Sequence, residues 1–406
     1  MEQYLPLISR ASLEEYEPEL LTYRRYLHAH PELSFQEYKT AQYIVDKMGQ
    51  LEHAEIIRPV GTSVLVKFAT GKPGPKIGLR ADMDALAITE KHDDISFKSK
   101  NDGVMHACGH DGHTAILMAA CCYFDEHFKS LTGEVWAIFQ HGEEVYPGGA
   151  QELVDTGLFD ELDFIYGQHI WASLPLGTID IKEGSASAYS DSYTIKIQGR
   201  GGNASEPEST IDPVTIGAFI VAKLQAVVAR QKSPQDAGVI SNTVFQAGDL
   251  NAINMIPDYC LLGGTIRTTS DEMRGQFKQA LLTMANSTCR EFGAMCEVEF
   301  EPGYGMIDND IQTTGFIRCI ANEMEETRVI QQKCMLDGED FSAFSKIVPS
   351  TFVFIGATNP ELGIDYPHHH PKFWIDERVL LYGLQLAVNA VLQYPHYFNE
   401  AQKVSA

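Results

Sequence analysis

Hydrophobic and polar positions follow a regular order along the first part of the chain. Two segments with helical spacing of apolar residues come first, and short apolar runs of strand length follow, with one alanine-rich helical run among them. The expected helices are 14–30, 40–51 and 114–128, and the expected strands are 62–70, 76–85, 133–140 and 163–170. Because apolar strands separated by helices are typical of parallel sheets buried on both faces, this part predicts an α/β fold with a mostly parallel sheet.

The pattern changes near Ser187 and then runs strand, helix, strand, strand, helix, strand. The expected strands are 191–200, 238–249, 258–268 and 294–302, and the expected helices are 212–231 and 270–293. Both helices begin with capping residues, Asp212 followed by Pro213 in the first and Ser270 in the second. The order βαββαβ is typical of a small α+β sandwich.

The α/β pattern resumes with a helix at 313–327, a strand at 350–358 and a helix at 376–393. The sequence therefore predicts a first domain, 1–186 with 303–406, that is interrupted by an inserted domain, 187–302. A chain of 406 residues is long enough for two hydrophobic cores.

Composition narrows the class of partner. The chain has 31 basic and 55 acidic residues, a formal net charge of −24, which disfavours nucleic acid and anionic membranes as partners. We find no signal-peptide pattern at the N-terminus and no stretch that approaches the roughly twenty apolar residues of a membrane span. Eight cysteines without a CxxC pair or a regular framework favour a reducing compartment, the cytoplasm.

Acidic residues and histidines gather where the predicted strands of the first domain end. Strand 76–85 carries Asp82 and Asp84 at its end, Glu143 and Glu144 follow the third strand, and His169 ends the fourth. Further candidates lie in the stretch VMHACGHDGH (104–113) and in His368, His369 and His370 after the last strand. One such residue alone is usually a cap or a loop residue. Because carboxyl ends of parallel strands meet at one sheet edge, the convergence predicts a metal site.

The candidate donors also indicate the metal and the chemistry. Thiolate, imidazole and carboxylate together favour zinc or manganese, with cobalt and nickel as alternatives, over magnesium or calcium. There are more candidates than one tetrahedral ion takes, so we expect two divalent ions that activate a water for attack on a carbonyl carbon. One of Glu143 and Glu144 would bind metal, and the other would take the proton from that water.

Motifs along almost the whole chain resemble the M20 metallopeptidase superfamily. They are RRYLHAHPELSFQE, LRADMDAL, MHACGHDGHTA, GEE, GQHIW, GRGG, NMIPD, GGTIRT, DGEDFSAF and HHPKF. They are most similar to the amidohydrolase branch, with its hippurate hydrolases, N-acyl-amino-acid deacylases, N-acetyl-diaminopimelate deacetylases and auxin-conjugate hydrolases. The resemblance implies a catalytic domain with two metal ions, a ferredoxin-like lid through which relatives form homodimers, and hydrolysis of N-acetyl- or N-benzoyl-type amino acids.

The resemblance also implies roles for single residues. The implied metal ligands are Cys108, which would bridge the two ions, and His110, Glu144, His169 and His369. Glu143 would be the general base, and Asp84 would orient a ligand. The family pattern places its ligand two residues before a proline, here Pro371, and this selects His369 over His368 and His370. His106 and His113 are expected beside the site, not as ligands.

In the lid, the resemblance implies that Asn254 and Arg267 face the active site, and Arg267 suits a substrate carboxylate. A salt bridge within the lid remains an alternative for Arg267. The chain departs from the family at GRGGNASEPES, where Asn203 and Glu208 replace histidines. Asn203 would then donate to the oxyanion from a neutral amide. A second departure places His141 and Gly142 where relatives usually have Pro-Ala.

Three further functions stay open at this point. A metal-loaded relative could bind acyl-amino acids or peptides with little turnover, an alternative that Asn203 and Glu208 favour. A dipeptidase of the same superfamily would differ only in the acyl side of its substrate. A redox role for Cys108 has least support, because it lacks an evident resolving cysteine.

Overall fold

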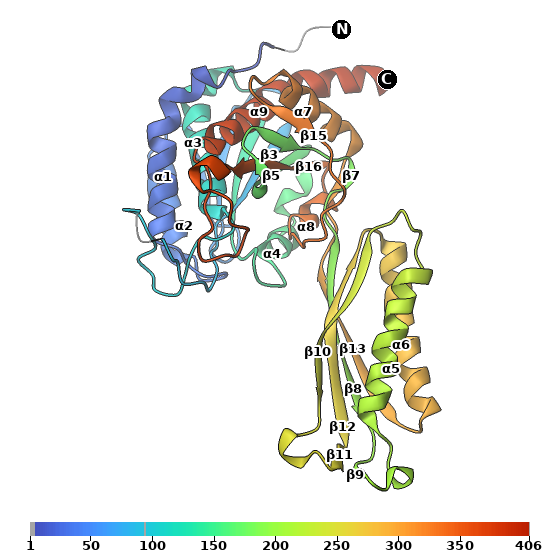
Figure 1. The fold of residues 1–406 in the computed structure, drawn as a ribbon. Helices are drawn as coiled ribbons and strands as arrows, with labels where there is room; N and C mark the ends of the chain where they lie inside the picture. Colours follow the sequence, from blue (N-terminus) through green and yellow to red (C-terminus); the bar gives the residue numbers. More distant parts are fainter. Residues whose placement is uncertain (1–4, 93–94, 406) are drawn as a thin grey trace. The chain divides into compact units, whose positions relative to one another are not determined.

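The computed structural model describes residues 5–92 and 95–405 and divides into two compact units. The first unit comprises Met1–Ala186, Ile307–Lys333 and Asp340–Ala406, and the second comprises Ser187–Met306 and Cys334–Glu339 (Figure 1). The sequence placed the end of the insertion at residue 302. The unit extends further because strand β13 (Met295–Tyr304) still pairs with β8 (Tyr189–Gln198) at Tyr304. Cys334 rejoins this unit, and its thiol donates to the Ser187 carbonyl oxygen at 3.1 Å.

An eight-stranded sheet forms the centre of the first unit, in the order β1-β2-β4-β3-β5-β16-β6-β15. Its strands are β1 (Glu55–Ile57), β2 (Val64–Ala69), β3 (Lys76–Asp82), β4 (Glu134–Gln140), β5 (Phe164–Pro175), β6 (Thr178–Asp180), β15 (Arg328–Ile330) and β16 (Ser350–Thr358). The four central strands, β4, β3, β5 and β16, are parallel to one another. The predicted mostly parallel α/β sheet is therefore confirmed. A small pair, β7 (Gly184–Ser185) and β14 (Asp308–Asn309), forms a separate two-stranded sheet beside β16.

Helices surround this sheet (Figure 1). They are α1 (Glu17–Ala29), α2 (Tyr38–Met48), α3 (His110–Glu126), α4 (Gly149–Asp155), α7 (Ile311–Glu323), α8 (Ser342–Ser345) and α9 (Val379–Ser405). Almost every residue of α3 is buried, because α3 packs against the sheet and against both α1 and α9. Its position matters for the site, since α3 begins at His110.

The parallel register brings the strand ends of the first unit to one edge. Asp82, the last residue of β3, is opposite Gln140, the last residue of β4. On the other side, His169 of β5 is opposite Phe354 of β16. Segments that follow β3, β4 and β16 therefore start from neighbouring positions, beside the side chain of His169.

The second unit is an antiparallel sheet in the order β10-β12-β8-β13, covered on one face by two helices (Figure 1). Besides β8 and β13, its elements are β9 (Gly202–Asn203), α5 (Pro213–Arg230), β10 (Gly238–Ala247), β11 (Met255–Ile256), β12 (Tyr259–Thr268) and α6 (Asp271–Glu291). The predicted caps are confirmed, because the Asp212 side chain accepts from the Val214 amide and the Ser270 side chain from the Met273 amide. A separate core joins the sheet and both helices.

Helix α5 corrects one sequence expectation. Among the described residues it is the one helix long and apolar enough to cross a membrane by length and composition, with 33% of that window buried. Ile216, Ile220 and Leu224 on its inner face belong to the core of the second unit. Its hydrophobicity therefore serves packing on that face.

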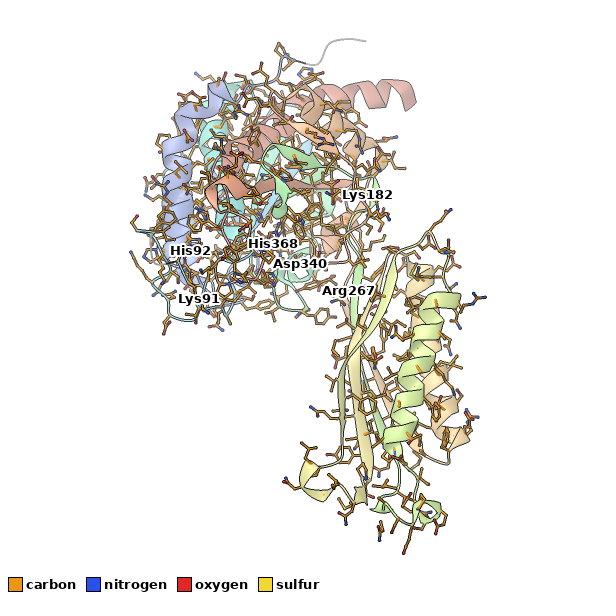
Figure 2. The ribbon with its side chains drawn as sticks, viewed as in Figure 1. Lys91, His92, Lys182, Arg267, Asp340 and His368 are labelled. Atoms are coloured by element: carbon orange, nitrogen blue, oxygen red, sulfur yellow. The ribbon has the colours of Figure 1, made fainter. Side chains whose placement is uncertain are left out.

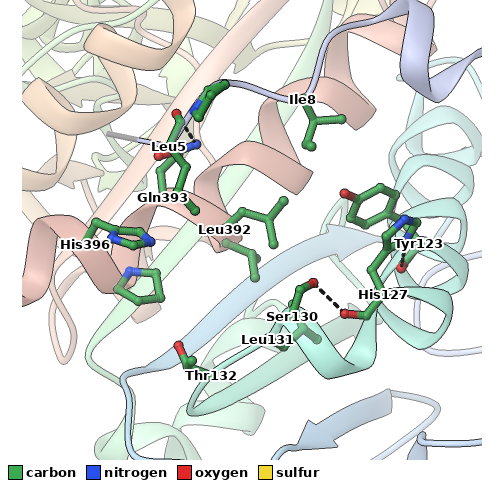
Figure 3. Close-up of a pocket in the computed structure, with 13 residues that line it drawn as sticks. Leu5, Ile8, Tyr123, His127, Ser130, Leu131, Thr132, Leu392, Gln393 and His396 are labelled. Carbon is green, nitrogen blue, oxygen red and sulfur yellow. Dashed lines mark hydrogen bonds between the residues drawn. The ribbon is translucent and has the colours of Figure 1, made fainter. Parts of the chain in front are cut away.

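A cavity of about 310 Å³ lies in the first unit between the N-terminal segment, the end of α3 and helix α9 (Figure 3). Leu5, Ile8 and Leu392 contribute apolar walls, and the Gln393 amide donates to the Leu5 carbonyl oxygen at 3.0 Å. None of the predicted site residues is among the residues described as its lining.

Replacement of Phe277 should unfold the second unit selectively. Phe277 is fully buried in its core, so Phe277→Ala should lower the free energy of unfolding of that unit by about 3–5 kcal/mol. Phe292→Ala is the matched control, because Phe292 follows the same helix but is 42% exposed, and it should cost less than about 1.5 kcal/mol. Urea titrations followed by circular dichroism measure both, and equal losses would contradict the assigned core.

Candidate metal centre

The predicted metal ligands of the first unit come from four places in the fold. Cys108 precedes α3, and His110 is the first residue of that helix. Between them Gly109 has φ +101°, a conformation that favours glycine and turns the chain into the helix. Glu144 follows β4, His169 lies in β5, and His369 lies in the segment after β16.

The ligand atoms of these residues form two groups that share one thiol. In the first group the donors of Cys108, His110 and His169 lie within 4.8 Å of one another. In the second, those of Cys108, Glu144 and His369 do so. A thiolate that bridges two metal ions needs a sulfur atom that belongs to both ligand groups, and Cys108 meets this requirement. The structure thus brings together all five predicted ligands.

Two ligand atoms at this place are buried and have no hydrogen-bond partner. His110 Nε2 and Glu144 Oε1 are buried without a hydrogen bond, although they are 3.8 Å apart. Buried polar atoms of this kind usually have a partner, so both suit metal coordination. His369 Nε2 lies 3.4 Å from the same glutamate oxygen, and Cys108 Sγ lies 3.5 Å from His169 Nε2. The residues present therefore fit a pair of divalent ions.

In His110 and His169, contacts of the Nδ1 atom fix the orientation of the imidazole ring. His110 Nδ1 lies 3.0 Å from the Asp84 carbonyl oxygen and 3.2 Å from Asp84 Oδ1. His169 Nδ1 lies 2.8 Å from the Ile170 carbonyl oxygen. Donation through Nδ1 leaves Nε2 as the free, basic nitrogen in both rings, the arrangement common among metal-binding histidines.

Asp84 lies behind the candidate ligands and is buried. Its Oδ2 accepts from the Ser34 hydroxyl at 2.7 Å and from the Glu144 amide at 2.9 Å. Burial raises the pKa of Asp84, but the hydrogen bond and the charge of His110 outweigh it, and the pKa is lowered overall. An ionised Asp84 thus orients one ligand by its side chain and another by its backbone.

The metal-free site holds protons where ligands need lone pairs. Burial lowers the pKa of His110, but Asp82 and Asp84 outweigh it and raise this pKa to about 10. Burial, followed by the charges of Glu144 and Glu143, raises the pKa of Cys108. Metal ions compete with exactly these protons in any site of imidazole and thiolate.

Glu143 lies close to the ligands without an assigned place among them. Its Oε2 is 4.0 Å from His110 Nε2, and its side chain is 9% exposed. Its donor atom forms a further group with those of His110 and Glu144. A carboxylate held beside a ligand set in this way can reach a water bound there.

The neighbouring histidines belong to neither of the donor groups that share Cys108. Both nitrogens of His113 are used, since Nδ1 lies 2.7 Å from Asp82 Oδ1 and Nε2 accepts from the Ile170 amide at 2.8 Å. His368 Nε2 accepts from the Ala172 amide at 2.9 Å. Burial lowers the pKa of His106 to about 4, and neither of its ring nitrogens has a hydrogen-bond partner.

His369 has a backbone conformation that its neighbours do not share. Its φ is +62°, which is uncommon for a residue with a side chain, and its amide donates to the Ala107 carbonyl oxygen at 2.8 Å. This bond ties the loop after β16 to the residue next to Cys108. Strain of this kind persists where surrounding contacts impose it, often at functional sites.

A buried ion network beneath the strand ends was not predicted from the sequence. Arg80 Nη1 and Nη2 each lie 2.7 Å from a carboxylate, of Asp82 and Asp340 respectively. The Gln140 side-chain oxygen accepts from Arg80 Nε at 2.7 Å. Figure 2 shows Asp340 and His368 within the first unit. The available signal was Arg80 itself, a charged residue inside the apolar run KIGLRAD.

The predicted lid residues lie in the second unit, Arg267 in the four-stranded sheet and Asn203 in the separate pair of β9 and β11. Asn203 of β9 pairs with Met255 of β11, and its side-chain oxygen accepts from the Ser205 amide at 3.1 Å. The Asn254 carbonyl oxygen accepts from the Ala204 amide at 3.0 Å, so Asn203 and Asn254 are neighbours. Arg267 lies near the end of β12 and donates to the Asp191 carbonyl oxygen at 3.3 Å (Figure 2).

The chain is similar to known proteins along most of its length. The family model described as peptidase family M20/M25/M40 matches residues 78–393. An N-acyl-L-amino acid amidohydrolase of Geobacillus stearothermophilus is 41% identical over 297 residues, 73% of this chain and 80% of that protein. Thermostable carboxypeptidase 1 of Saccharolobus solfataricus is 36% identical over 375 residues, 91% and 94% of the two chains.

A solved structure extends the likeness to the whole fold. The crystal structure of a Bacillus subtilis protein described as a dinuclear metal binding peptidase from the M20 family has a TM-score of 0.82 and 31% identity. The match covers 94% of this chain and 99% of that one. The resemblance seen in the sequence motifs is thereby confirmed, and the chain belongs to the M20 family of metallopeptidases.

Proposed function

We propose that this protein is a metal-dependent amidohydrolase that cleaves the amide bond of N-acyl amino acids of the acetyl or benzoyl type. The observation that carries the proposal is the pair of donor groups that share Cys108, with the Glu143 carboxylate beside them. Relatives named as amidohydrolase and carboxypeptidase both cleave an amide bond next to an amino acid, which supports this reaction class.

The protein residues divide the work of such a hydrolysis. Two divalent ions, held by Cys108, His110, Glu144, His169 and His369, would supply electrophilic activation of water and of the amide carbonyl. Glu143 takes the proton from the attacking water and delivers it to the leaving amine nitrogen. Asp84 keeps Nε2 of His110 turned toward the ligand set through its contacts with Nδ1. The products are a free carboxylic acid and an amino acid.

The donor set supports a choice of metal. A thiolate and three imidazoles favour zinc, with manganese as the other leading candidate and cobalt or nickel as alternatives.

We also propose a cytoplasmic location. The cysteines of the described chain are all free thiols, which supports this location.

We also propose a homodimer formed through the second unit. From Tyr259 to Arg267 strand β12 spans about 26 Å at about 3.3 Å per residue, longer than an N-acyl amino acid. Asn203, the proposed oxyanion donor, pairs with Met255, which precedes that strand in the chain. One chain therefore cannot place Asn203 and Arg267 on the same small substrate. Two chains can, with Arg267 on the carboxylate and Asn203 on the oxyanion. The exposed Leu250 (93%) and Ile253 (85%) support an interface there.

A second candidate is a relative that binds acyl-amino acids or peptides with little turnover, and a third is a dipeptidase. The binding relative is favoured by Asn203, whose neutral amide stands where the family has histidine. The dipeptidase is favoured by the carboxypeptidase relative. A substrate panel of N-acetyl and N-benzoyl amino acids and dipeptides separates the dipeptidase from the amidohydrolase.

Replacement of the proposed base should abolish turnover but keep the metal. Glu143→Gln should lower kcat on the best substrate of the panel by about 10²–10⁴-fold, because the amide cannot accept the proton of water. Elemental analysis should still find two ions per chain. Glu161→Gln, a change at a 51% exposed carboxylate, is the control and should leave kcat unchanged. Persistent activity of Glu143→Gln with metal bound would exclude this mechanism.

The three adjacent histidines allow a test of the ligand assignment. His369→Ala should reduce the metal content from two ions per chain to about one, since its side chain is the one of the three in a donor group. His370→Ala should retain two, because the ring of His370 stacks on Tyr366 at 4.6 Å between centroids instead. Both rings belong to one short loop, so similar losses in the two variants would refute the assignment.

Restoration of the family histidine tests the second candidate function. If Asn203 already serves as the oxyanion donor, Asn203→His should change kcat by less than about threefold. A gain of about 10²-fold would instead identify the natural chain as a weakened catalyst whose main role is binding. Steady-state kinetics on the same substrate panel measure either outcome, and circular dichroism checks that the second unit remains folded.

A further inference from the structure

The segment between β4 and α4, residues 141–148, carries both Glu143 and Glu144, and we call it the catalytic loop. Two buried carboxylates hold its backbone on either side of Glu143. The amide of Glu144, after the base, donates to Asp84 Oδ2 at 2.9 Å. The amide of Gly142, before the base, donates to Glu37 Oε1 at 2.8 Å. The proposed base is thus flanked by two anchored peptide groups.

Glu37 is itself fixed by several donors. It is fully buried, and its Oε1 also accepts from the Phe35 amide at 2.9 Å. Its Oε2 accepts from the Thr62 hydroxyl at 2.6 Å. Burial raises the pKa of this carboxyl group. The carboxylate therefore joins the segment before α2, the turn before β2 and the catalytic loop, which are far apart in the sequence.

A helix cap does not explain why a carboxylate is buried here. Glu37 occupies the N-cap position of α2, but its side chain makes no capping hydrogen bond. Glu32 binds the first turn of that helix instead, since its Oε2 accepts from the Thr40 amide at 2.8 Å and from the Thr40 hydroxyl at 2.9 Å. One acceptor atom of Glu37, Oε1, instead reaches the catalytic loop, 105 residues away along the chain.

The loop also fits closely against the segment that carries Glu37. Gly142 has φ +63°, and a Cβ atom there would lie 2.8 Å from the Phe35 ring. The ring of His141 packs edge-on against Phe35 at 5.4 Å between centroids. His141 Nδ1 lies 2.5 Å from the Ser63 hydroxyl, and its Nε2 lies 3.0 Å from Glu152 Oε2. Contacts on several sides therefore hold the start of the catalytic loop.

We infer that Glu37 is a positioning residue for the catalytic base: it fixes the amide of Gly142 on one side of Glu143, as Asp84 fixes the amide of Glu144 on the other. The inference rests on the proposed role of Glu143. Loss of the Glu37 acceptors leaves the Gly142 amide without its partner and releases one side of the base. A base displaced by about 1 Å costs up to about 10²-fold in rate, whereas binding of the substrate ground state depends on other groups.

The test compares Glu37→Ala with the natural chain in two measurements. Hydrogen exchange, followed by mass spectrometry on the metal-free protein, should show amides of residues 139–149 exchanging about tenfold faster. Steady-state kinetics of the metal-loaded protein should show kcat lowered about 10- to 100-fold with KM within about threefold. Metal content should remain at two ions, because Asp84 still holds the Glu144 amide.

Two further variants separate positioning from general stability. Glu37→Gln keeps an oxygen acceptor for the Gly142 amide and an amide donor toward Thr62, so it should restore slow exchange of the loop and kcat within about threefold. Glu32→Ala removes a carboxylate of the same segment that binds Thr40, and it should speed exchange only at the start of α2. Its kcat should stay within about threefold of the natural chain.

Several results would overturn the inference. Unchanged exchange of residues 139–149 in Glu37→Ala would show that Glu37 does not hold the loop. Faster exchange across the whole first unit, with Glu32→Ala behaving alike, would show a general structural role. A Glu37→Gln variant as impaired as Glu37→Ala would show that charge, not the acceptor, matters. Absence of any amidohydrolase activity in the natural chain would refute the proposed function, while the exchange measurements would still decide whether Glu37 holds the loop.

Discussion

The carboxylate of Asp84 is the constraint on which the candidate metal centre depends. One of its oxygens faces His110 Nδ1, and the other accepts from the Glu144 amide and the Ser34 hydroxyl. A ligand on α3 and a ligand after β4 are thereby set relative to one another by a single rigid group. Because the charge and hydrogen bond of His110 lower the pKa of Asp84 against the effect of burial, this acceptor stays ionised.

A second layer keeps the strand ends that carry these groups in place. Arg80 lies between the carboxylates of Asp82 and Asp340. Asp340 also accepts at 3.0 Å from the amide of Ala150, which lies at the start of α4. Removal of one member would leave an unpaired charge in the interior, which is strongly destabilising. Since Asp82 also binds His113, whose other nitrogen accepts from the Ile170 amide, the network reaches the strand of His169. The scaffold therefore connects three neighbouring strand ends without relying on metal.

The sequence predicted the features that depend on local pattern. Continuous apolar runs predicted the parallel sheet, and capping residues predicted the starts of α5 and α6, because both signals are confined to a few consecutive residues. The strand-end rule selected Glu143, Glu144 and His169 as neighbours of the motif around Cys108, and the structure brings their donor atoms together. Family motifs, not spacing, separated His369 from the two histidines beside it.

Other features depend on contacts that no local pattern encodes. Glu37 reaches Gly142 across 105 residues, and the sequence shows it only as one acidic residue before a helix. The separation of Asn203 and Arg267 depends on strand pairing. Asn203 pairs with β11, which precedes the start of β12, whereas Arg267 lies near the end of β12, although both match motifs of a single active site. The extension of the second unit to Met306 likewise follows from pairing of β13 that continues past the predicted end.

The balance of charge at the centre explains why divalent ions fit it. Four carboxyl groups, those of Asp82, Asp84, Glu143 and Glu144, lie around His110. Burial lowers the pKa of His110, but Asp82, Asp84 and Glu144 outweigh it and raise this pKa to about 10. Burial and the two glutamates likewise keep the Cys108 thiol protonated. A divalent cation held here would compete with these protons, balance the carboxylates and leave imidazole and thiolate as donors. The buried acidic groups thus favour metal binding, and Asp84 and Glu37 accept from two amides of the catalytic loop on either side of Glu143.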